Sequence, residues 1–369
     1  MYNLGKHPYF EKWVDPTSGI ESFILKERVA PVQQSFYFVN SSVSPDEKWL
    51  WFYTAFPPAR YKTLGVVSLD PLNPIIHIFP HAVVDGALPM ITPDSKGAYF
   101  GINASASIWR IDLDGNTEEV CRLSDKYINH RRVNLLATHL TLSADGKYLL
   151  LDGQIGNIWF VGLGDLKTGK VKILHEFGRC HNHAQFSPVD HKLFMIPQDW
   201  WRDANTGHYM ILDQRIWLMD TDCTRFEPLL HEWFGHGSAA THEWWSKDGM
   251  VCWIDYEKGA FECDVVKRQP VNVWPGPLCH GHCDSTRRYW CADQNPYNWD
   301  KKPCEVRFYD RETKKEVHIV TALPKPPVPR DWYHLDPHPQ FSPKDTWVVY
   351  TTTVQGSVDV ALVPVQNIV

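Results

Sequence analysis

Histidines recur at one position of a repeated segment, and they are the residues of this chain best suited to chemistry. Four copies of the segment begin with a histidine: His139, His183, His242 and His338. A fifth copy has Gly281 at this position, flanked by His280 and His282. The chain holds 18 His in 369 residues, about one in twenty, so four at one repeat position is an excess. Because imidazole acts as a general base near neutral pH and as a metal ligand, the recurrence predicts a site of acid–base or metal chemistry.

The repeated segment itself predicts the fold. Its fullest copy is His338-Pro339-Gln340-Phe341-Ser342-Pro343-Lys344-Asp345. Seven copies are centred at positions 45, 93, 144, 188, 247, 286 and 343, on average about 50 residues apart, which is the spacing of propeller blades. Ser, Pro, Asp and Gly favour a tight reversal, and apolar runs such as 148–151 follow each one as strands. Two linked hairpins per copy predict an all-β, seven-bladed β-propeller of four-stranded blades.

No linker-like or low-complexity stretch interrupts the repeats. We therefore expect residues 1–369 to form a single propeller domain. A strand at residues 22–25 is expected to pair beside residues 358–365 and to complete the last blade, because closing the ring removes exposed sheet edges.

The predicted propeller brings the histidines together. The repeat position starts the innermost strand of each blade, so these residues should meet at the mouth of the central channel. Strand alternation adds His181 beside His183, and Asp336 with His334 beside His338. Such a mixture of imidazole and carboxylate suits Mn, Fe or Zn. The alternative is that each histidine only forms hydrogen bonds across a narrow channel.

One insertion is expected to lie over this mouth. The longest step between copies, from 188 to 247, contains Trp200, Trp201 and Arg202, followed by Arg215. The tryptophans could stack on a sugar ring or could simply pack, and Arg215 could bind substrate or form a structural ion pair.

The segment Cys279-His280-Gly281-His282-Cys283 contains four residues of the types that bind zinc. Strand alternation separates the two histidines from the two cysteines, which makes one tetrahedral site awkward. We expect one of His280 and His282 to join the channel site instead, and spacing does not decide which.

The composition of the chain restricts the classes of molecule that it can bind. A net charge of −6 and the absence of a basic run argue against nucleic acid and against an anionic membrane surface. No apolar run reaches membrane-spanning length, and the first residues lack the apolar core of a signal peptide. Nine cysteines, an odd number, fit reduced thiols, so we expect a cytoplasmic protein.

Several of these stretches together resemble a known family. They are Trp13-x-Asp15 with Ser18-Gly19, Ser35-Phe36-Tyr37-Phe38, His183-Ala184-Gln185-Phe186-Ser187-Pro188, Asp213-Gln214-Arg215-Ile216-Trp217, His242-Glu243-Trp244 and Pro337-His338-Pro339. In these residues the chain resembles the oligogalacturonate lyases, the seven-bladed propellers of polysaccharide lyase family 22.

The resemblance implies a cytoplasmic lyase that cleaves short uronate oligomers by β-elimination with Mn²⁺. It implies that His242 is the catalytic base, that Arg215 is essential, and that His280 or His282 ligates the metal together with His338. Asp336 stands where the family has a further His, and Tyr333, beside His334, stands where it has a Gln.

The chemistry of elimination agrees with these residue types. Removing the proton at C5 of a uronate requires a cation on the carboxylate, a base near neutral pH and a group that orients a neighbouring carboxylate. We therefore predict a metal-dependent uronate-oligomer lyase with His242 as base and Arg215 as orienting group. The predicted metal ligands are His280 or His282, His334, Asp336 and His338, and the predicted substrate contacts are His139, His181, His183, Trp200, Trp201, Arg202 and Tyr333. Lysis or epimerisation of a different acidic sugar, or a non-catalytic interaction propeller, are the alternatives.

Overall fold

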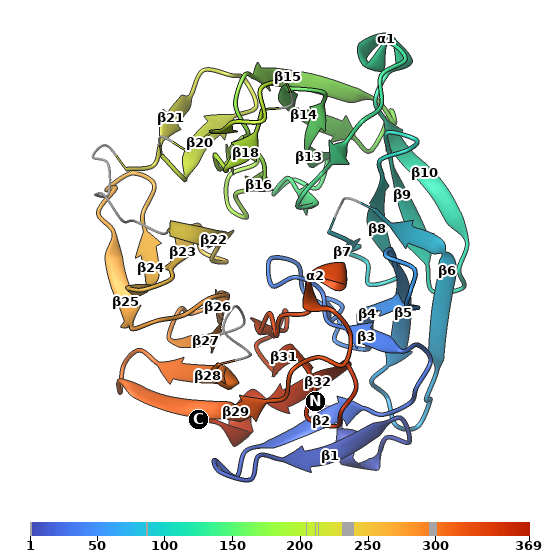
Figure 1. Ribbon diagram of the computed structural model, residues 1–369, viewed down its shortest axis with the longest axis vertical. Helices are drawn as coiled ribbons and strands as arrows, with labels where there is room; N and C mark the ends of the chain where they lie inside the picture. Colours follow the sequence, from blue (N-terminus) through green and yellow to red (C-terminus); the bar gives the residue numbers. More distant parts are fainter. Residues whose placement is uncertain are drawn as a thin grey trace.

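Seven antiparallel sheets are arranged radially around a central opening in the computed structural model (Figure 1). The structure describes residues 2–85, 88–203, 205–210, 212, 214–230, 240–294 and 301–369; Asp213, part of the resemblance noted above, lies outside them. Within these ranges each of the seven sheets has four or five strands, and in the first six the strand nearest the axis comes first in chain order. The predicted seven-bladed β-propeller is confirmed.

The first three blades follow one another along the chain. Blade 1 consists of β3 (Val32–Gln34), β4 (Trp49–Ala55), β5 (Lys62–Ser68) and β6 (Ile76–Val84). Blade 2 consists of β7 (Met90–Ile91), β8 (Gly97–Ile102), β9 (Ser107–Asp112) and β10 (Thr117–Arg122). In blade 3, β11 (Leu135–Leu136) and β12 (Thr141–Leu142) both pair with β13 (Tyr148–Ile155), followed by β14 (Ile158–Asp165) and β15 (Val171–Phe177).

The next three blades have the same order. Blade 4 consists of β16 (Gln185–Phe186), β17 (Leu193–Met195), β20 (Trp217–Asp220) and β21 (Phe226–Pro228). Blade 5 consists of β22 (Ala240–Trp245), β23 (Val251–Asp255), β24 (Gly259–Cys263) and β25 (Val271–Pro275). Blade 6 consists of β26 (Gly281–Cys283), β27 (Tyr289–Gln294), β28 (Cys304–Asp310) and β29 (Lys315–Leu323).

Blade 7 joins the two ends of the chain. It contains β30 (Gln340–Phe341), β31 (Trp347–Thr352) and β32 (Asp359–Pro364), and the N-terminal β2 (Glu21–Leu25) and β1 (Phe10–Val14) add to its outer edge. Phe23 pairs with Leu362 and Ile24 with Ala361, which is the predicted closure.

Helices are few and short among the described residues. They are η1 (Leu4–Lys6), α1 (Asp125–Ile128), α2 (Arg330–Tyr333) and η3 (Val365–Asn367). None of the described helices has the length and apolar character needed to cross a bilayer. Of the two helices labelled in Figure 1, α2 lies near the centre of the ring and α1 lies at its rim.

The Ser-x-Asp-Gly turn between the first two strands of a blade forms for local reasons. In blade 3 the Ser143 hydroxyl donates to Asp145, 2.7 Å, and the Gly146 N–H donates to the Ser143 carbonyl, 2.8 Å. Gly146 has φ of +72°, a conformation that glycine adopts without a steric penalty. In blade 5 Ser246, Asp248 and Gly249 repeat this turn, so the sequence repeat is a turn repeat.

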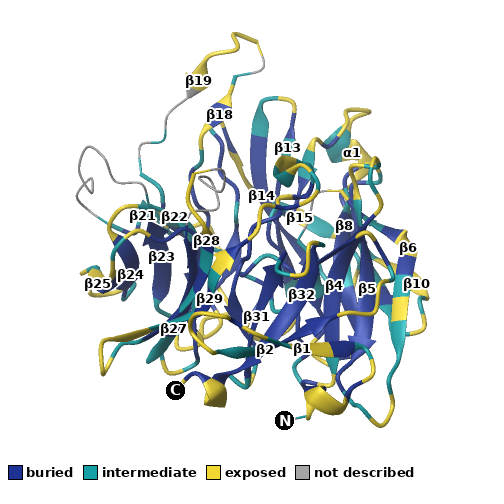
Figure 2. Cartoon of the chain, turned by 60° about the horizontal axis from the view of Figure 1, so that its bottom comes forward, coloured by how far each residue is buried: buried dark blue, intermediate teal, exposed yellow. Residues whose placement is uncertain are grey.

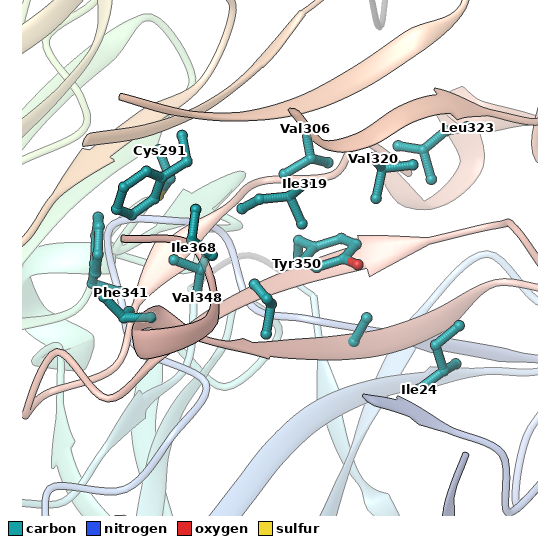
Figure 3. Close-up of a cluster of buried hydrophobic side chains, with 14 of the residues drawn as sticks. Ile24, Cys291, Val306, Ile319, Val320, Leu323, Phe341, Val348, Tyr350 and Ile368 are labelled. Carbon is teal, nitrogen blue, oxygen red and sulfur yellow. The ribbon is translucent and has the colours of Figure 1, made fainter. Parts of the chain in front are cut away.

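The core lies between neighbouring blades. Figure 3 shows the cluster where blades 6 and 7 meet, with Ile319 and Val306 facing Val348 and Tyr350. Ile24 of the closing strand belongs to this cluster and is fully buried. The same apolar cluster therefore stabilises both the contact between blades 6 and 7 and the closure of the ring.

The insertion of blade 4 forms a separate hairpin between the second and third strands of the blade. Its strands are β18 (Trp201–Arg202) and β19 (Tyr209–Met210). Figure 2 shows this hairpin projecting beyond the body of the propeller.

Replacing Ile24 with Ala tests whether β2 carries the closure. Removing this buried side chain should lower the free energy of unfolding by about 2–5 kcal/mol, measured by denaturant titration. Val14→Ala, at a 44% exposed position of β1, is the matched control and should change it by less than about 0.5 kcal/mol. Equal effects of the two substitutions would contradict the assignment.

Candidate active site

Five imidazoles from five consecutive blades meet at the axis. The ring centroids of His139 and His183 are 4.7 Å apart, those of His242 and His280 4.2 Å, and those of His280 and His338 4.3 Å. The structure thus brings together the residues that the repeat position selects. In blade 6 the histidine that joins them is His280.

Tyr37 of blade 1 lies in the middle of these rings, and the sequence analysis gave it no role. Its ring centroid is 4.7 Å from that of His338, 5.5 Å from that of His139 and 5.8 Å from that of His280. Asn40, the residue of blade 1 at the repeat position, donates its amide N–H groups to the carbonyls of Pro89 and Leu140. Blade 1 therefore contributes a tyrosine to the centre, and its repeat position serves packing.

The backbone at the repeat position is left-handed. His183, His242 and His338 have φ of +55°, +53° and +46°. This conformation is unfavourable for a residue with a Cβ and costs on the order of 1–2 kcal/mol. It also interrupts the extended strand, so side chains before and after it do not alternate as they would along a regular strand.

Four ligand-type side chains form a compact group at the axis. One ligand atom each from His280, His334, Asp336 and His338 lies within 4.8 Å of the others. Nε2 of His280 and both ring nitrogens of His338 are buried without a hydrogen-bond partner. An unpartnered buried polar atom costs about 1–3 kcal/mol, so these nitrogens fit a bound cation better than an empty channel. The donor set suits Mn²⁺, Fe²⁺ or Zn²⁺.

Asp293, at the end of β27, holds two of these residues in place. Its fully buried carboxylate accepts the His280 backbone N–H at 2.9 Å and the His338 backbone N–H at 3.1 Å. It also lies 3.0 Å from His280 Nδ1. A ring N–H on Nδ1 leaves Nε2 as the lone-pair nitrogen that faces the group, which is the arrangement found around metal-binding histidines.

Asp336 is shared between the group and α2. Arg330 donates from Nε and Nη2 to its two oxygens, and His334 Nε2 is 3.2 Å from Oδ2. Although burial favours the neutral acid, the hydrogen bonds from His334 and Arg330 hold the pKa of Asp336 below its ordinary value. The carboxylate is therefore ionised and can ligate a cation through a lone pair that Arg330 leaves free.

His242 is held between two hydroxyl groups. Its Nδ1 lies 2.8 Å from the Tyr37 hydroxyl and its Nε2 2.8 Å from the Tyr256 hydroxyl. Burial, and then the neighbouring His280 and Arg215, lower the pKa of His242 well below 6.5. A neutral imidazole has one N–H and one lone pair, so one tyrosine accepts and the other donates. His242 is thus an unprotonated base at neutral pH.

Arg215 is the most heavily paired cation of the site. Its Nε and Nη2 donate to both oxygens of Glu243, 3.1 and 2.8 Å, and Nη1 lies 2.8 Å from Asp199. Nη2 is also 3.2 Å from His183 Nδ1. Arg215 therefore forms the structural ion pair that was one of its two expected roles. It also contacts the axial histidines through His183.

Other predicted site residues lie away from the axial group. His181 packs on Phe177 with ring centroids 4.4 Å apart, because the left-handed backbone at His183 breaks the expected alternation. His282 accepts the Phe341 N–H at 3.2 Å through Nδ1 and is not part of the ligand-type group.

The structure gives different surroundings to Trp200, Trp201, Arg202 and Tyr333, the remaining predicted substrate contacts. Trp201 is 9% exposed and packs in the core of blades 3 and 4, whereas Trp200 is 62% exposed. Arg202 lies over the Tyr209 ring. Tyr333 is buried against Val32 and Leu335, with its hydroxyl donating to the Ala59 carbonyl.

The Cys279–Cys283 segment does not close a zinc site of its own among the described residues. Cys279 can form a ligand group only with His242 and His280, and His280 is shared with the group described above. Burial raises the pKa of the Cys279 thiol well above 9, which disfavours the thiolate needed for metal binding. All nine cysteines are unpaired.

Comparison with known proteins yields one relative by sequence. The oligogalacturonate lyase of Dickeya dadantii (strain 3937) is 21% identical over 216 residues, 52% of this chain and 52% of that protein. The chain thus spans about half the length of the curated relative that it matches. No protein-family model matches the chain.

Two solved structures share the whole fold. An oligogalacturonate lyase in complex with manganese aligns with a TM-score of 0.77 and 16% identity, covering 98% of this chain and 97% of that chain. An oligogalacturonate lyase from Vibrio parahaemolyticus aligns with a TM-score of 0.78 and 16% identity, covering 96% of each. The resemblance to oligogalacturonate lyases noted from the sequence is confirmed by these matches.

The buried neutral histidines predict acid sensitivity. Burial lowers the pKa of His139 to about 3 and that of His282 to about 4, whereas both are near 6.5 in the unfolded chain. Between pH 6.5 and about 4 the unfolded state therefore binds more protons, and folding stability should fall as the pH falls. Each such histidine contributes up to about 1.4 kcal/mol per pH unit. Urea titrations at pH 7, 6 and 5 measure this slope.

A substitution at His282 isolates one contribution. His282→Asn keeps an acceptor for the Phe341 N–H but does not titrate, so the slope below pH 6.5 should decrease by up to about 1.4 kcal/mol per pH unit. His77→Asn, at an exposed position of β6, should leave it unchanged. A slope that is the same in wild type and His282→Asn would contradict the prediction.

Proposed function

We propose that this chain is a divalent-metal-dependent lyase that cleaves short uronate oligomers, of the oligogalacturonate type, by β-elimination. One observation carries the proposal: the four-ligand group with its unpartnered buried imidazole nitrogens lies directly beside His242. The similarity to proteins named oligogalacturonate lyases supports the substrate class. Nine unpaired cysteines support a reducing compartment, in keeping with a cytoplasmic enzyme.

The metal site would consist of His280, His334, Asp336 and His338. A bound divalent ion would act as a Lewis acid on the carboxylate of the reacting sugar and thereby acidify the adjacent carbon. Mn²⁺ is the proposed ion, because the donor set suits it and a structurally similar lyase was solved with manganese.

His242 is the proposed base that removes the C5 proton. In the absence of substrate, one ring nitrogen accepts a tyrosine O–H, and the other donates to the second tyrosine. The C5–H of the substrate would replace the donating hydroxyl, while the remaining tyrosine keeps the ring oriented and accepts its N–H. A low pKa ensures that the imidazole is unprotonated when substrate binds.

Arg215 is proposed to orient substrate through the N–H of Nη2 that points to His183. Its charge is already balanced by Glu243 and Asp199, so its role would be directional hydrogen bonding rather than strong attraction. The same two carboxylates fix its position.

Replacing His242 with Ala tests the base assignment. Formation of the unsaturated, ultraviolet-absorbing product from digalacturonate should fall by about 10²-fold or more. Manganese content and the circular dichroism spectrum should stay as in wild type. The His77→Ala control should retain full activity, because His77 is exposed on β6 of blade 1. Unchanged turnover in His242→Ala would refute the base assignment.

Replacing Asp293 with Asn tests the metal site without using turnover. Loss of the carboxylate that orients His280 and His338 should weaken Mn²⁺ binding about 10–100-fold, measured by calorimetric or electron-paramagnetic-resonance titration. Asp222→Asn, at an exposed ion pair with Lys192, is the matched control. Equal Mn²⁺ affinity in wild type and Asp293→Asn would exclude this group as the metal site.

A further inference from the structure

The cations at the axial site differ in how fully they are neutralised. Arg215 is bound by two carboxylates, Glu243 and Asp199. Arg330 donates to both oxygens of Asp336. An acidic substrate would have to compete with these carboxylates for either guanidinium group. A carboxylate-binding position therefore requires a cation that the protein itself leaves unneutralised.

Lys62, the first residue of β5, is such a cation. Its ammonium group is 3.4 Å from the Tyr333 carbonyl and lies 3.9 Å from the centroid of the Tyr53 ring. Among the residues that the structure describes, it forms no ion pair. Tyr53 offers no hydrogen-bonding compensation, because its hydroxyl is buried without a partner.

The position of Lys62 places this charge at the site. Its carbonyl partner, Tyr333, immediately precedes His334 in the chain. Burial is the main cause of the lowered pKa values of His334 and His338, and the nearby Lys62 charge lowers both further. Lys62 thus lies on the blade 1 side of the ligand-type group, whereas Arg215 approaches from blade 4.

Lys62 is only partly exposed to solvent, and partial burial without a counter-ion makes its ammonium group costly. Desolvation lowers the pKa of Lys62 to about 8, so it remains largely protonated at neutral pH. A buried charge is normally paired, and an unpaired one is expected where a ligand completes the pair. An ammonium group binds carboxylate as a point charge, and the bond is strong where water is excluded.

A second cation lies nearby at the mouth. The guanidinium group of Arg60, two residues before Lys62, lies 4.6 Å above the ring of Trp332 in α2. Arg60 is exposed and forms no ion pair with a described residue. The loop before β5 and helix α2 thus present positive charge without matching carboxylates.

We propose that Lys62 binds a carboxylate of the substrate and thereby forms an acidic-sugar subsite next to the reacting sugar. This inference rests on the proposed function, in which the carboxylate of the reacting sugar is bound by the metal ion. Lys62 would then bind the carboxylate of the adjoining sugar, so the substrate must carry acidic groups on two successive residues. Lys62 is in this sense a specificity-determining residue.

Steady-state kinetics of the manganese-loaded protein on digalacturonate test the subsite. Lys62→Met should raise KM about tenfold or more while kcat stays within about threefold, because binding but not the chemistry is lost. Lys62→Arg, which keeps the charge, should restore KM to within about threefold of wild type. Lys26→Met, at an exposed position after β2, is the control and should match wild type.

Thermal unfolding separates binding from a structural role. Met fills the space of the lysine stem and removes a partly buried charge that has no counter-ion, so the melting temperature of Lys62→Met should equal or exceed that of wild type. A lowered melting temperature in both Lys62→Met and Lys62→Arg, with KM unchanged, would mean that Lys62 is structural and would overturn the proposal.

Calorimetry keeps this test independent of turnover. Wild type should bind digalacturonate more tightly than the neutral disaccharide galactobiose, and Lys62→Met should lose about tenfold of that preference. Equal affinities of wild type and Lys62→Met for digalacturonate would overturn the Lys62 assignment even if the lyase activity is found. If wild type binds digalacturonate without cleaving it and Lys62→Met binds it more weakly, the subsite is upheld and the proposed lyase activity is overturned.

Discussion

Closure of the ring is the constraint on which the site depends, because its five axial histidines and Tyr37 come from six different blades. His280 and His338 come from blades 6 and 7, and Tyr37 comes from blade 1. The seam between the last and first blades runs between Tyr37 and His338. Gln340 spans this seam, accepting the Ser42 N–H and donating to the Phe36 carbonyl, 2.7 and 2.9 Å. Gln340 thus ties the segment of blade 1 that carries Tyr37 to the segment of blade 7 that carries His338.

Nearby residues of the repeated segment have different structural roles. In two copies a glutamine follows the histidine by two positions, and its amide ties one blade to another. Gln340 does so between blades 7 and 1, and Gln185 donates to the Glu243 carbonyl, 2.9 Å, between blades 4 and 5. Glu243 in turn holds Arg215. The His-x-Gln pattern therefore combines a side chain facing the axis with one that fixes the next blade, and the geometry of the site is set by blade packing.

The sequence predicts the fold and the convergence of the histidines because both follow from the repeat period. The sequence does not predict side-chain positions that depend on local backbone geometry. A left-handed residue at His183 could not be predicted from the spacing, and His181 packs between blades 3 and 4, against Phe177 and Trp217. Likewise, only the contact of Asp293 with His280 distinguishes His280 from His282.

Tyr37 was missed for a different reason, since it occupies a position that is unique to blade 1 and has no counterpart in the other copies. Tyr256 and Asp293 lie on later strands or loops of their blades, where the repeat carries no polar signal. Contacts of this kind depend on the three-dimensional path of each blade. Within one blade, the end of the second strand lies beside the start of the first. A search for polar residues at that end could therefore have suggested Asp293 as a partner of His280.

Charge decides the order in which ligands can bind. Apart from the exposed Arg60 at the mouth, three cations around the axial group, Arg215, Arg330 and Lys62, face four carboxylates, those of Asp199, Glu243, Asp293 and Asp336. His183, His242 and His338 add no positive charge, because burial lowers their pKa values well below 6.5. One negative charge is thus in excess, which disfavours an anionic oligosaccharide. A divalent ion reverses the excess to one positive charge. In the proposed function the metal ion is therefore needed for the substrate to bind as well as for the proton to leave, and affinity for acidic sugars should depend on prior metal binding.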